Sequence, residues 1–224
     1  MTKQDDTEHM DKYVLSTGIR VGTQVKTKFM IPFITKATNE GLYIIDSKKT
    51  LSRIQTAAKF INRANISKVL VCSGREYAST PVEKFCEVTG ATVMLGRFMP
   101  GTLTNPTLPY YIEPELVFVS DPQVDEQAVL EATNAGIPVI GIANTDNVTS
   151  KIDLIIPANN RGRKSLAATY WLLAREILIQ KGELTPEQQM KYEIDDFETK
   201  ITEEELEEEA AERAPQLRSR SKRQ

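Results

Sequence analysis

Short apolar runs alternate with helical patterns along the middle of this chain. The runs, each of four to six residues, are Leu42–Ile45, Val69–Cys72, Thr92–Leu95, Leu116–Val119, Ile137–Ile142 and Asp153–Ile156. Between the first two runs, apolar residues from Leu51 to Ile61 recur at helical spacing. Strands joined by helices are typical of βαβ units, whose parallel strands are buried on both faces. The pattern therefore predicts an α/β fold, a three-layer sandwich with a mostly parallel sheet.

Three more helices are predicted from the same patterns: Pro81–Thr89, Asp121 to about Asn134, and Arg161–Lys181. In the second helix, Asp121 is a suitable N-cap and Pro122 suits the first helical position. The third has apolar residues around much of its circumference, so we expect it to be packed on several sides. Gly18–Val25 is interrupted by glycine but is otherwise strand-like.

The two ends of the chain differ from the middle in composition. Residues 1–10 are polar and predict a disordered leader, so we place the α/β domain at residues 11–182. Residues 183–224 form an acidic and then basic extension, which we expect to be largely disordered when free. Within it, Glu203–Glu209 contains six acids in seven residues, which repel one another.

The formal net charge of −3 conceals a segregation of charge along the chain. Tyr13–Gly182 carries 19 Lys and Arg against 14 Asp and Glu, a net charge of +5. Glu183–Glu212 carries 2 against 13, a net charge of −11, and Arg213–Gln224 carries five cations and no acid. A basic core with charged extensions is consistent with a protein that associates with a polyanion.

Several classes of function lack their usual residues. The one histidine, His9, lies in the polar leader, and Cys72 and Cys86 have no metal-ligand spacing, so we expect no metal and no histidine-dependent catalysis. Two cysteines also favour a reduced, cytoplasmic protein. No window approaches the roughly 18 to 20 apolar residues of a membrane span. The Gly-rich nucleotide motifs are missing, so we expect no cofactor.

Gly96–Pro106 is a loop, because its two Pro, two Gly and one Asn suit neither a helix nor a central strand. It follows a predicted strand, and ligands bind at the carboxyl ends of strands in open α/β sheets. The loop carries Arg97, Phe98 and two threonine hydroxyls but no acid, histidine or cysteine. It can therefore hold an anion, but it offers no general base.

Three other strand ends carry polar residues. Ser73–Glu76 forms either a backbone nest that presents Arg75 to a phosphate or a turn with an N-cap serine. Asn144–Asp146 supplies either a catalytic carboxylate or an ordinary Asx turn, and the turn is favoured. Asn159–Ser165 places three cations where a helix begins, although Ser165 would suffice as its cap. Because cations are unfavourable there, the cluster favours an external phosphate over simple solvent screening.

The order and spacing of several segments resemble the small-subunit ribosomal protein two ("S-two") family, in its archaeal and eukaryotic cytosolic form. The eukaryotic relatives are also described as laminin-receptor precursors. The similarity extends from Tyr13 to Lys181. The segments that carry it are Gly18–Gln24, Arg97–Pro106, Pro114–Asp121, Asp125, Glu131, Gly136–Pro138, Asn144–Asp146, Asn160–Ser165 and Tyr170–Trp171.

This resemblance implies a protein without enzymatic activity that binds small-subunit ribosomal RNA (rRNA) and neighbouring ribosomal proteins in the cytoplasm. It also implies a flavodoxin-like, Rossmann-like sandwich. Bacterial members insert a coiled-coil hairpin after the Thr-Asn of the loop, but only eight residues separate Asn105 from Pro114 here. We therefore expect no hairpin. Arg20 stands where many relatives have histidine, which adds a cation.

We predict that rRNA contacts are made by basic residues that approach phosphates without reading bases. The predicted residues are Arg20, Lys26, Lys28, Arg75, Arg97, Arg161, Arg163 and Lys164. We expect no catalytic residue, no small-molecule substrate and no membrane partner. The alternatives are an α/β enzyme acting on a small phosphorylated substrate through Ser73–Arg75 or Asn144–Asp146, and an interaction module that uses the acidic tail.

Overall fold

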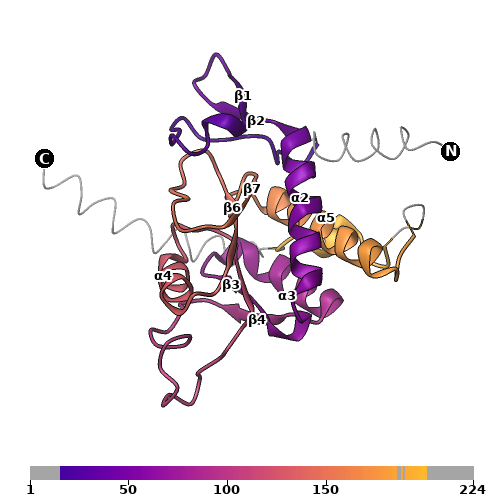
Figure 1. Cartoon of the computed structure of the whole chain (residues 1–224). Coiled ribbons are helices and arrows are strands. Elements are labelled where there is room, and N and C mark those ends of the chain that lie inside the picture. Colours follow the sequence, from indigo (N-terminus) through magenta and orange to yellow (C-terminus); the bar gives the residue numbers. More distant parts are fainter. Residues whose placement is uncertain (1–15, 186–187, 189, 201–224) are drawn as a thin grey trace, which may run out of the picture.

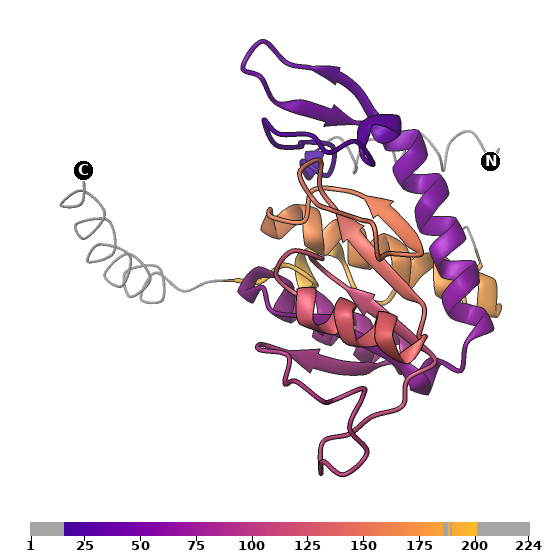
Figure 2. The ribbon, with the colours of Figure 1, turned by 60° about the vertical axis from the view of Figure 1, so that its left-hand side comes forward.

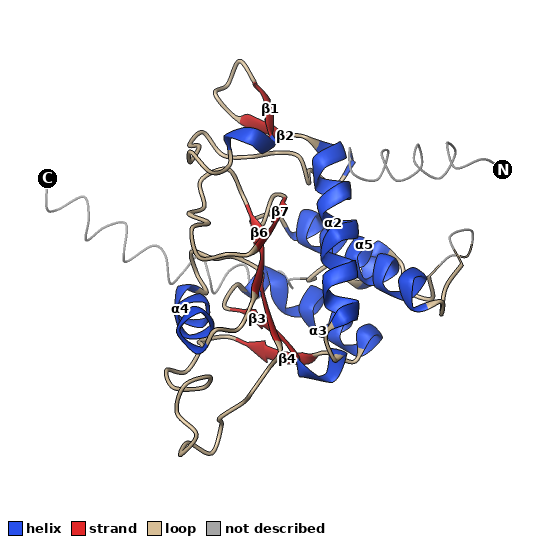
Figure 3. Ribbon diagram, viewed as in Figure 1, coloured by secondary structure: helices blue, strands red, loops and turns tan. Residues whose placement is uncertain are grey.

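A five-stranded parallel sheet forms the centre of the protein. The computed structural model describes residues 16–185, 188 and 190–200. The strands are β3 (Val69–Ser73), β4 (Thr92–Leu95), β5 (Leu116–Val119), β6 (Val139–Ala143) and β7 (Leu154–Pro157). They lie in the order β4-β3-β5-β6-β7, and every neighbouring pair is parallel. Figure 3 shows the strands between the helices of the two sides. The central strands β3, β5 and β6 are buried throughout, as their apolar sequences predict.

Helices cover both faces of the sheet, which confirms the predicted three-layer α/β sandwich. One layer contains α2 (Ser47–Arg63), α3 (Ser79–Thr89) and α5 (Arg163–Lys181), and the opposite layer contains α4 (Glu126–Ala135) (Figure 1). Helix α5 buries ten residues because it packs against the sheet and against both α2 and α3. This contact explains the wide apolar surface of its sequence.

The layer of α4 is completed by the segment between β4 and β5. Phe98 and Leu103 of this segment are buried in the same apolar cluster as the inner face of α4. Residues 96–115 contain turns and no helix. The expected lack of a hairpin insertion is therefore confirmed.

The N-terminal part of the structure differs from the prediction. Leu42–Ile45 was expected to belong to the parallel sheet, but β2 (Tyr43–Ile45) instead pairs antiparallel with β1 (Ile34–Ala37), a strand that the sequence did not reveal. The two form a hairpin that projects from the body (Figure 2). Gly18–Val25 is a turn followed by a single bridge from Val21 rather than a strand. A short apolar run fits a strand of a small hairpin as well as a strand of the parallel sheet, so the run could not distinguish them.

Two predicted helix starts were also wrong. Helix α4 begins at Glu126 after the N-cap Asp125, four residues later than predicted. Asp121 instead begins a separate turn, in which its side chain accepts from the Gln123 amide at 2.9 Å. Helix α5 has Gly162 as its N-cap, and Ser165 lies within its first turn. The Ser165 hydroxyl donates to the Asn159 carbonyl at 2.6 Å instead of capping the helix.

The packed body extends past residue 182, the predicted end of the domain. Phe197 is fully buried against the larger core, and Met190 is nearly so. The Trp171 indole donates to the Tyr192 carbonyl at 2.9 Å, which ties the segment to α5. The sequence of residues 190–200 shows no helical periodicity, because single side chains such as Met190 and Phe197 attach the segment to the core. The predicted leader, residues 1–10, and residues 201–224 lie outside the described residues.

Candidate nucleic-acid interface

Five of the eight predicted site residues follow the carboxyl ends of sheet strands. Arg97 comes after β4, Arg75 after β3, and the cluster Arg161–Lys164 after β7. All strands are parallel, so these ends lie along one edge of the sheet. Segments that are distant in sequence thus contribute cations to the same edge, which we call the carboxyl edge.

The N-terminal segment, residues 18–30, brings the other three site residues to this edge. The Thr27 amide donates to the Thr145 carbonyl just after β6, at 2.8 Å, so Lys26 and Lys28 flank a point attached to the edge. Lys26 and Lys28 are exposed. Similarly, the Asn159 amide donates to the Ile19 carbonyl at 2.9 Å, which places Arg20 beside the turn that follows β7.

A network of buried side chains fixes the turns of the edge relative to one another. The Asn147 side chain donates to Asp121 at 2.9 Å, and its carbonyl oxygen accepts from the Asn160 side chain at 3.1 Å. Asn144 donates to Asn159 at 3.3 Å, and Asn159 donates to the Gly18 carbonyl at 3.3 Å. The turns after β5, β6 and β7 and the N-terminal segment are therefore held as one unit. The sequence analysis did not predict that these Asn side chains link the turns, although several Asn residues clustered after neighbouring strands would have indicated it.

The start of α5 combines uncapped amides with exposed cations. No side chain caps the N-terminus within the described residues, so the amides of the first turn have no side-chain acceptor. Arg163 and Lys164 are exposed at the first two helical positions. Their charges add to the positive end of the helix dipole, which favours a bound phosphate at this point.

The neighbouring Arg161 has an intramolecular partner. Its guanidinium forms an ion pair with Asp146, while its side chain remains 48% exposed. Asp146 was the candidate catalytic carboxylate. It belongs instead to a turn in which the Thr145 amide donates to the Asn144 side chain at 2.8 Å. The turn interpretation thus fits the structure.

The nest after β3 is occupied by the protein's own carboxylates. The Gly74 amide donates to Asp125 at 2.7 Å, and Arg75 forms a two-nitrogen ion pair with the buried Asp121. Burial raises the pKa of Asp125 to about 7, against the hydrogen bonds from Gly74 and Asp121 that lower it. An incoming phosphate would meet two carboxyl groups at this position. The site residue Arg75 is therefore less available than the other cations.

The loop Gly96–Pro106 is held by a carboxylate from another element. Glu131 of α4 accepts from the Gly101 amide at 2.8 Å and from the Leu103 amide at 3.2 Å. Burial raises the pKa of Glu131, but hydrogen bonds from Gln127 and these amides outweigh burial and lower it overall. Arg97 is exposed and Phe98 is buried beneath the loop. The loop therefore presents Arg97 on a fixed base.

The described residues offer little for catalysis. Within them, no three His, Cys, Asp or Glu side chains gather at one metal site. Cys72 and Cys86 are free and buried, and burial raises both thiol pKa values, that of Cys86 to about 12. Such thiols are poor nucleophiles at neutral pH. No helix in this part of the chain is long and apolar enough to cross a bilayer.

Comparison with known proteins places the chain in a family. The family model described as "Ribosomal protein S2" matches residues 14–110 and 109–179. A protein of Nitrosopumilus maritimus named "Small ribosomal subunit protein uS2" is 71% identical over 92% of this chain and 100% of its own length. Proteins of the same name from Cenarchaeum symbiosum and Thermofilum pendens are 58% and 53% identical, over 88% and 84% of this chain and 95% and 87% of their own. The chain therefore belongs to the ribosomal protein S2 family.

Proposed function

We propose that this protein is a structural constituent of the small ribosomal subunit in the cytoplasm, where it binds rRNA and neighbouring ribosomal proteins to support translation. The observation that carries the RNA contact is the carboxyl edge, where eight cations from separate segments lie along one side of the sheet. The name of the relatives, small ribosomal subunit protein uS2, supports the assignment to the small subunit.

The charge balance of the edge supports a polyanion as its ligand. Six of its cations form no ion pair within the described residues: Arg20, Lys26, Lys28, Arg97, Arg163 and Lys164. Among the acids of these turns, Asp121 and Asp125 are buried and Asp146 is paired, whereas Glu76 and Glu126 are exposed. The six unpaired cations outnumber these two exposed acids, so the edge as a whole is cationic.

The mode of contact that fits this surface is recognition of the phosphate backbone. Lys and Arg on rigid turns, together with a helix N-terminus, approach phosphates and position a protein on RNA without reading bases. The network of Asn side chains and Asp121 holds these turns in place before RNA binds, so little conformational entropy is lost on binding.

The alternative of an α/β enzyme acting on a phosphorylated substrate is not favoured. Its two candidate sites have internal partners: Asp125 occupies the Gly74 amide, and Arg161 pairs with Asp146. The N-terminal segment also covers the carboxyl ends of β6 and β7 through Thr27 and Ile19. We propose that the chain has no enzymatic activity.

The test is a triple variant of the start of α5. Changing Arg161, Arg163 and Lys164 to Ala should reduce incorporation into small subunits on sucrose gradients without unfolding the free protein. Loss of the Arg161–Asp146 ion pair should lower the melting temperature of the free protein, but the variant should still unfold cooperatively. The matched control removes three exposed cations near the opposite edge of the sheet: Lys59, Arg63 and Lys68. Both triples change the net charge equally, so only the location differs.

Normal incorporation of the α5 triple variant would contradict the proposed interface, and equal losses for both triples would indicate a bulk charge effect. Saturable binding of a sugar phosphate in calorimetry, without sedimentation on ribosomal subunits, would instead support the enzyme.

A further inference from the structure

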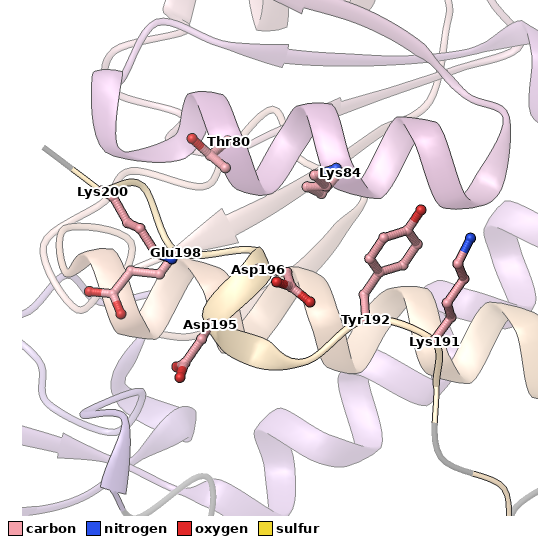
Figure 4. A pocket seen from close by; sticks show the side chains of 8 residues that line it. All are labelled: Thr80, Lys84, Lys191, Tyr192, Asp195, Asp196, Glu198 and Lys200. Carbon is pink, nitrogen blue, oxygen red and sulfur yellow. The ribbon is translucent and has the colours of Figure 1, made fainter.

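The described chain ends beside the carboxyl edge. Residues 190–200 lie along α3, with Tyr192 near Lys84 and Lys200 near Thr80 at the start of the helix (Figure 4). The Thr199 hydroxyl donates to the Tyr77 carbonyl at 3.0 Å. Tyr77 lies in the short connection between the end of β3 and the start of α3. Lys200, the last described residue, therefore lies next to the carboxyl edge.

The segment that begins there has the charge opposite to that of the edge. Glu203–Glu209, with its six acids, starts three residues after Lys200. Six cations of the edge have no ion pair within the described part of the chain. The cleft between α3 and residues 190–200 has three lysines and three acids, so it is balanced and attracts an acidic segment less.

The lengths of the two parts also match. The five strand ends of the sheet span about 19 Å, given a spacing of about 4.8 Å between neighbouring strands. Seven extended residues span about 23 Å. A connection this short keeps the effective concentration of the acids near the edge in the millimolar range, where weak ion pairs suffice.

We propose that Glu203–Glu209 docks on the carboxyl edge in the free protein and that RNA displaces it. The cations would then be covered by an internal anion until a denser anion, the RNA backbone, takes its place. Weak, nonspecific binding to other polyanions is disfavoured in consequence.

A contact measurement without RNA tests the docking directly. A carbodiimide joins a carboxylate to a lysine amine only when the two groups are in contact. In the free full-length protein, peptides that contain Glu203–Glu209 should crosslink to Lys26, Lys28 or Lys164. Salt at 0.5 M shortens the Debye length to roughly half its physiological value, so it should remove these crosslinks. No such crosslink, or equal crosslinking to Lys59 and Lys68, would overturn the proposal.

A competition measurement tests the displacement. A variant with all six glutamates of the run changed to Gln should bind an rRNA fragment about tenfold more tightly, within the range usual for coupled sites. The matched control makes the same charge change at exposed acids elsewhere: Glu40, Glu83, Glu87, Glu113, Glu115 and Glu183. An equal gain in the control would overturn displacement in favour of net charge.

The two measurements separate this proposal from the proposed function. Crosslinking requires no RNA, so it can fail while the protein still enters subunits. The competition step rests on the proposed function, because it needs RNA to bind the edge. Crosslinks without any RNA affinity would support the docking and count against the RNA interface.

Discussion

Two turns of the carboxyl edge carry arginine at comparable positions but present it differently. After β3, Arg75 pairs with the buried Asp121, and the adjacent Gly74 amide is occupied by Asp125. At the start of α5, Arg163 and Lys164 are exposed, and no side chain caps the helix within the described residues. The charge of Arg75 is neutralised by a carboxylate of the protein, whereas Arg163 and Lys164 have no carboxylate partner among the described residues.

This difference shows that an arginine near a strand end is not by itself a binding residue. What matters is whether the fold supplies a carboxylate that reaches it. Asp121 reaches Arg75 because β3 and β5 are neighbouring strands, although the two residues are 46 positions apart. The pair stabilises the fold at that point, and the α5 turn remains available for RNA.

The largest expected effect comes from breaking the neutralised turn. Asp121→Ala removes the partner of Arg75 and the acceptor for the Asn147 side chain and the Gln123 amide. We expect unfolding free energy to fall by about 3 kcal/mol, since an uncompensated charge remains partly buried. Urea denaturation measures this change. Lys68→Ala, which breaks an exposed pair with Glu115, serves as the control and should change little; similar losses in both would count against a special role for Asp121.

The second prediction concerns the attachment of the N-terminal segment. A Cβ on Gly22 would lie 2.7 Å from the Tyr43 carbonyl oxygen and 2.6 Å from a Thr145 methyl. Gly22→Ala should therefore destabilise the protein by about 2 kcal/mol, as overpacking does. Hydrogen exchange should become faster at the Thr27 amide. Val21→Ala changes a more exposed side chain of the same segment and should have little effect. Unchanged protection in the Gly22 variant would mean that the segment can shift without cost.

The third prediction uses the titration of Asp125. Because its folded pKa of about 7 exceeds the usual 3.8, the folded state binds the proton more tightly than the unfolded chain. This group therefore stabilises the protein below pH 4, and the contribution is lost as pH rises toward 7, at up to about 1.4 kcal/mol per pH unit. Asp125→Asn should lack this slope. Denaturation of both proteins at pH 5, 6, 7 and 8 gives the difference, and parallel curves would show that Asp125 does not titrate there.

The smallest expected effect compares the two arginines on RNA. Arg97→Ala should lower the slope of log affinity against log salt by about 0.7 to 0.9, the value for one phosphate contact. Arg75→Ala should leave this slope nearly unchanged, provided that circular dichroism shows a folded protein. Fluorescence anisotropy measures the RNA affinity of each variant at several KCl concentrations between about 50 and 200 mM, a range over which the slope can be determined. The comparison fails if both variants change the slope equally.

The elements that the sequence predicted correctly are those with extensively buried apolar surfaces. Strands β3, β5 and β6 were found because both of their faces are apolar, and α5 because most of its surface is packed. The hairpin β1–β2 was not found, because its strands are short and largely outside the core. Phe197 was also missed, because a single anchor leaves no periodic pattern.

The candidate site was predictable only as a set of residue types. The cations could be named, but the ion pairs of Arg75 and Arg161 depend on contacts across 46 and 15 positions of sequence. Glu131 was visible as part of the family resemblance, yet its role as the acceptor for the loop amides depended on α4 packing beside the loop.

The sequence alone determined the layers of the fold, the cationic character of the core and the family, because local apolar periodicity and residue order encode them. Only the tertiary structure decided which cations stay unpaired. That outcome depends on distances between strand ends, and electrostatic attraction acts through those distances and not through separation along the chain.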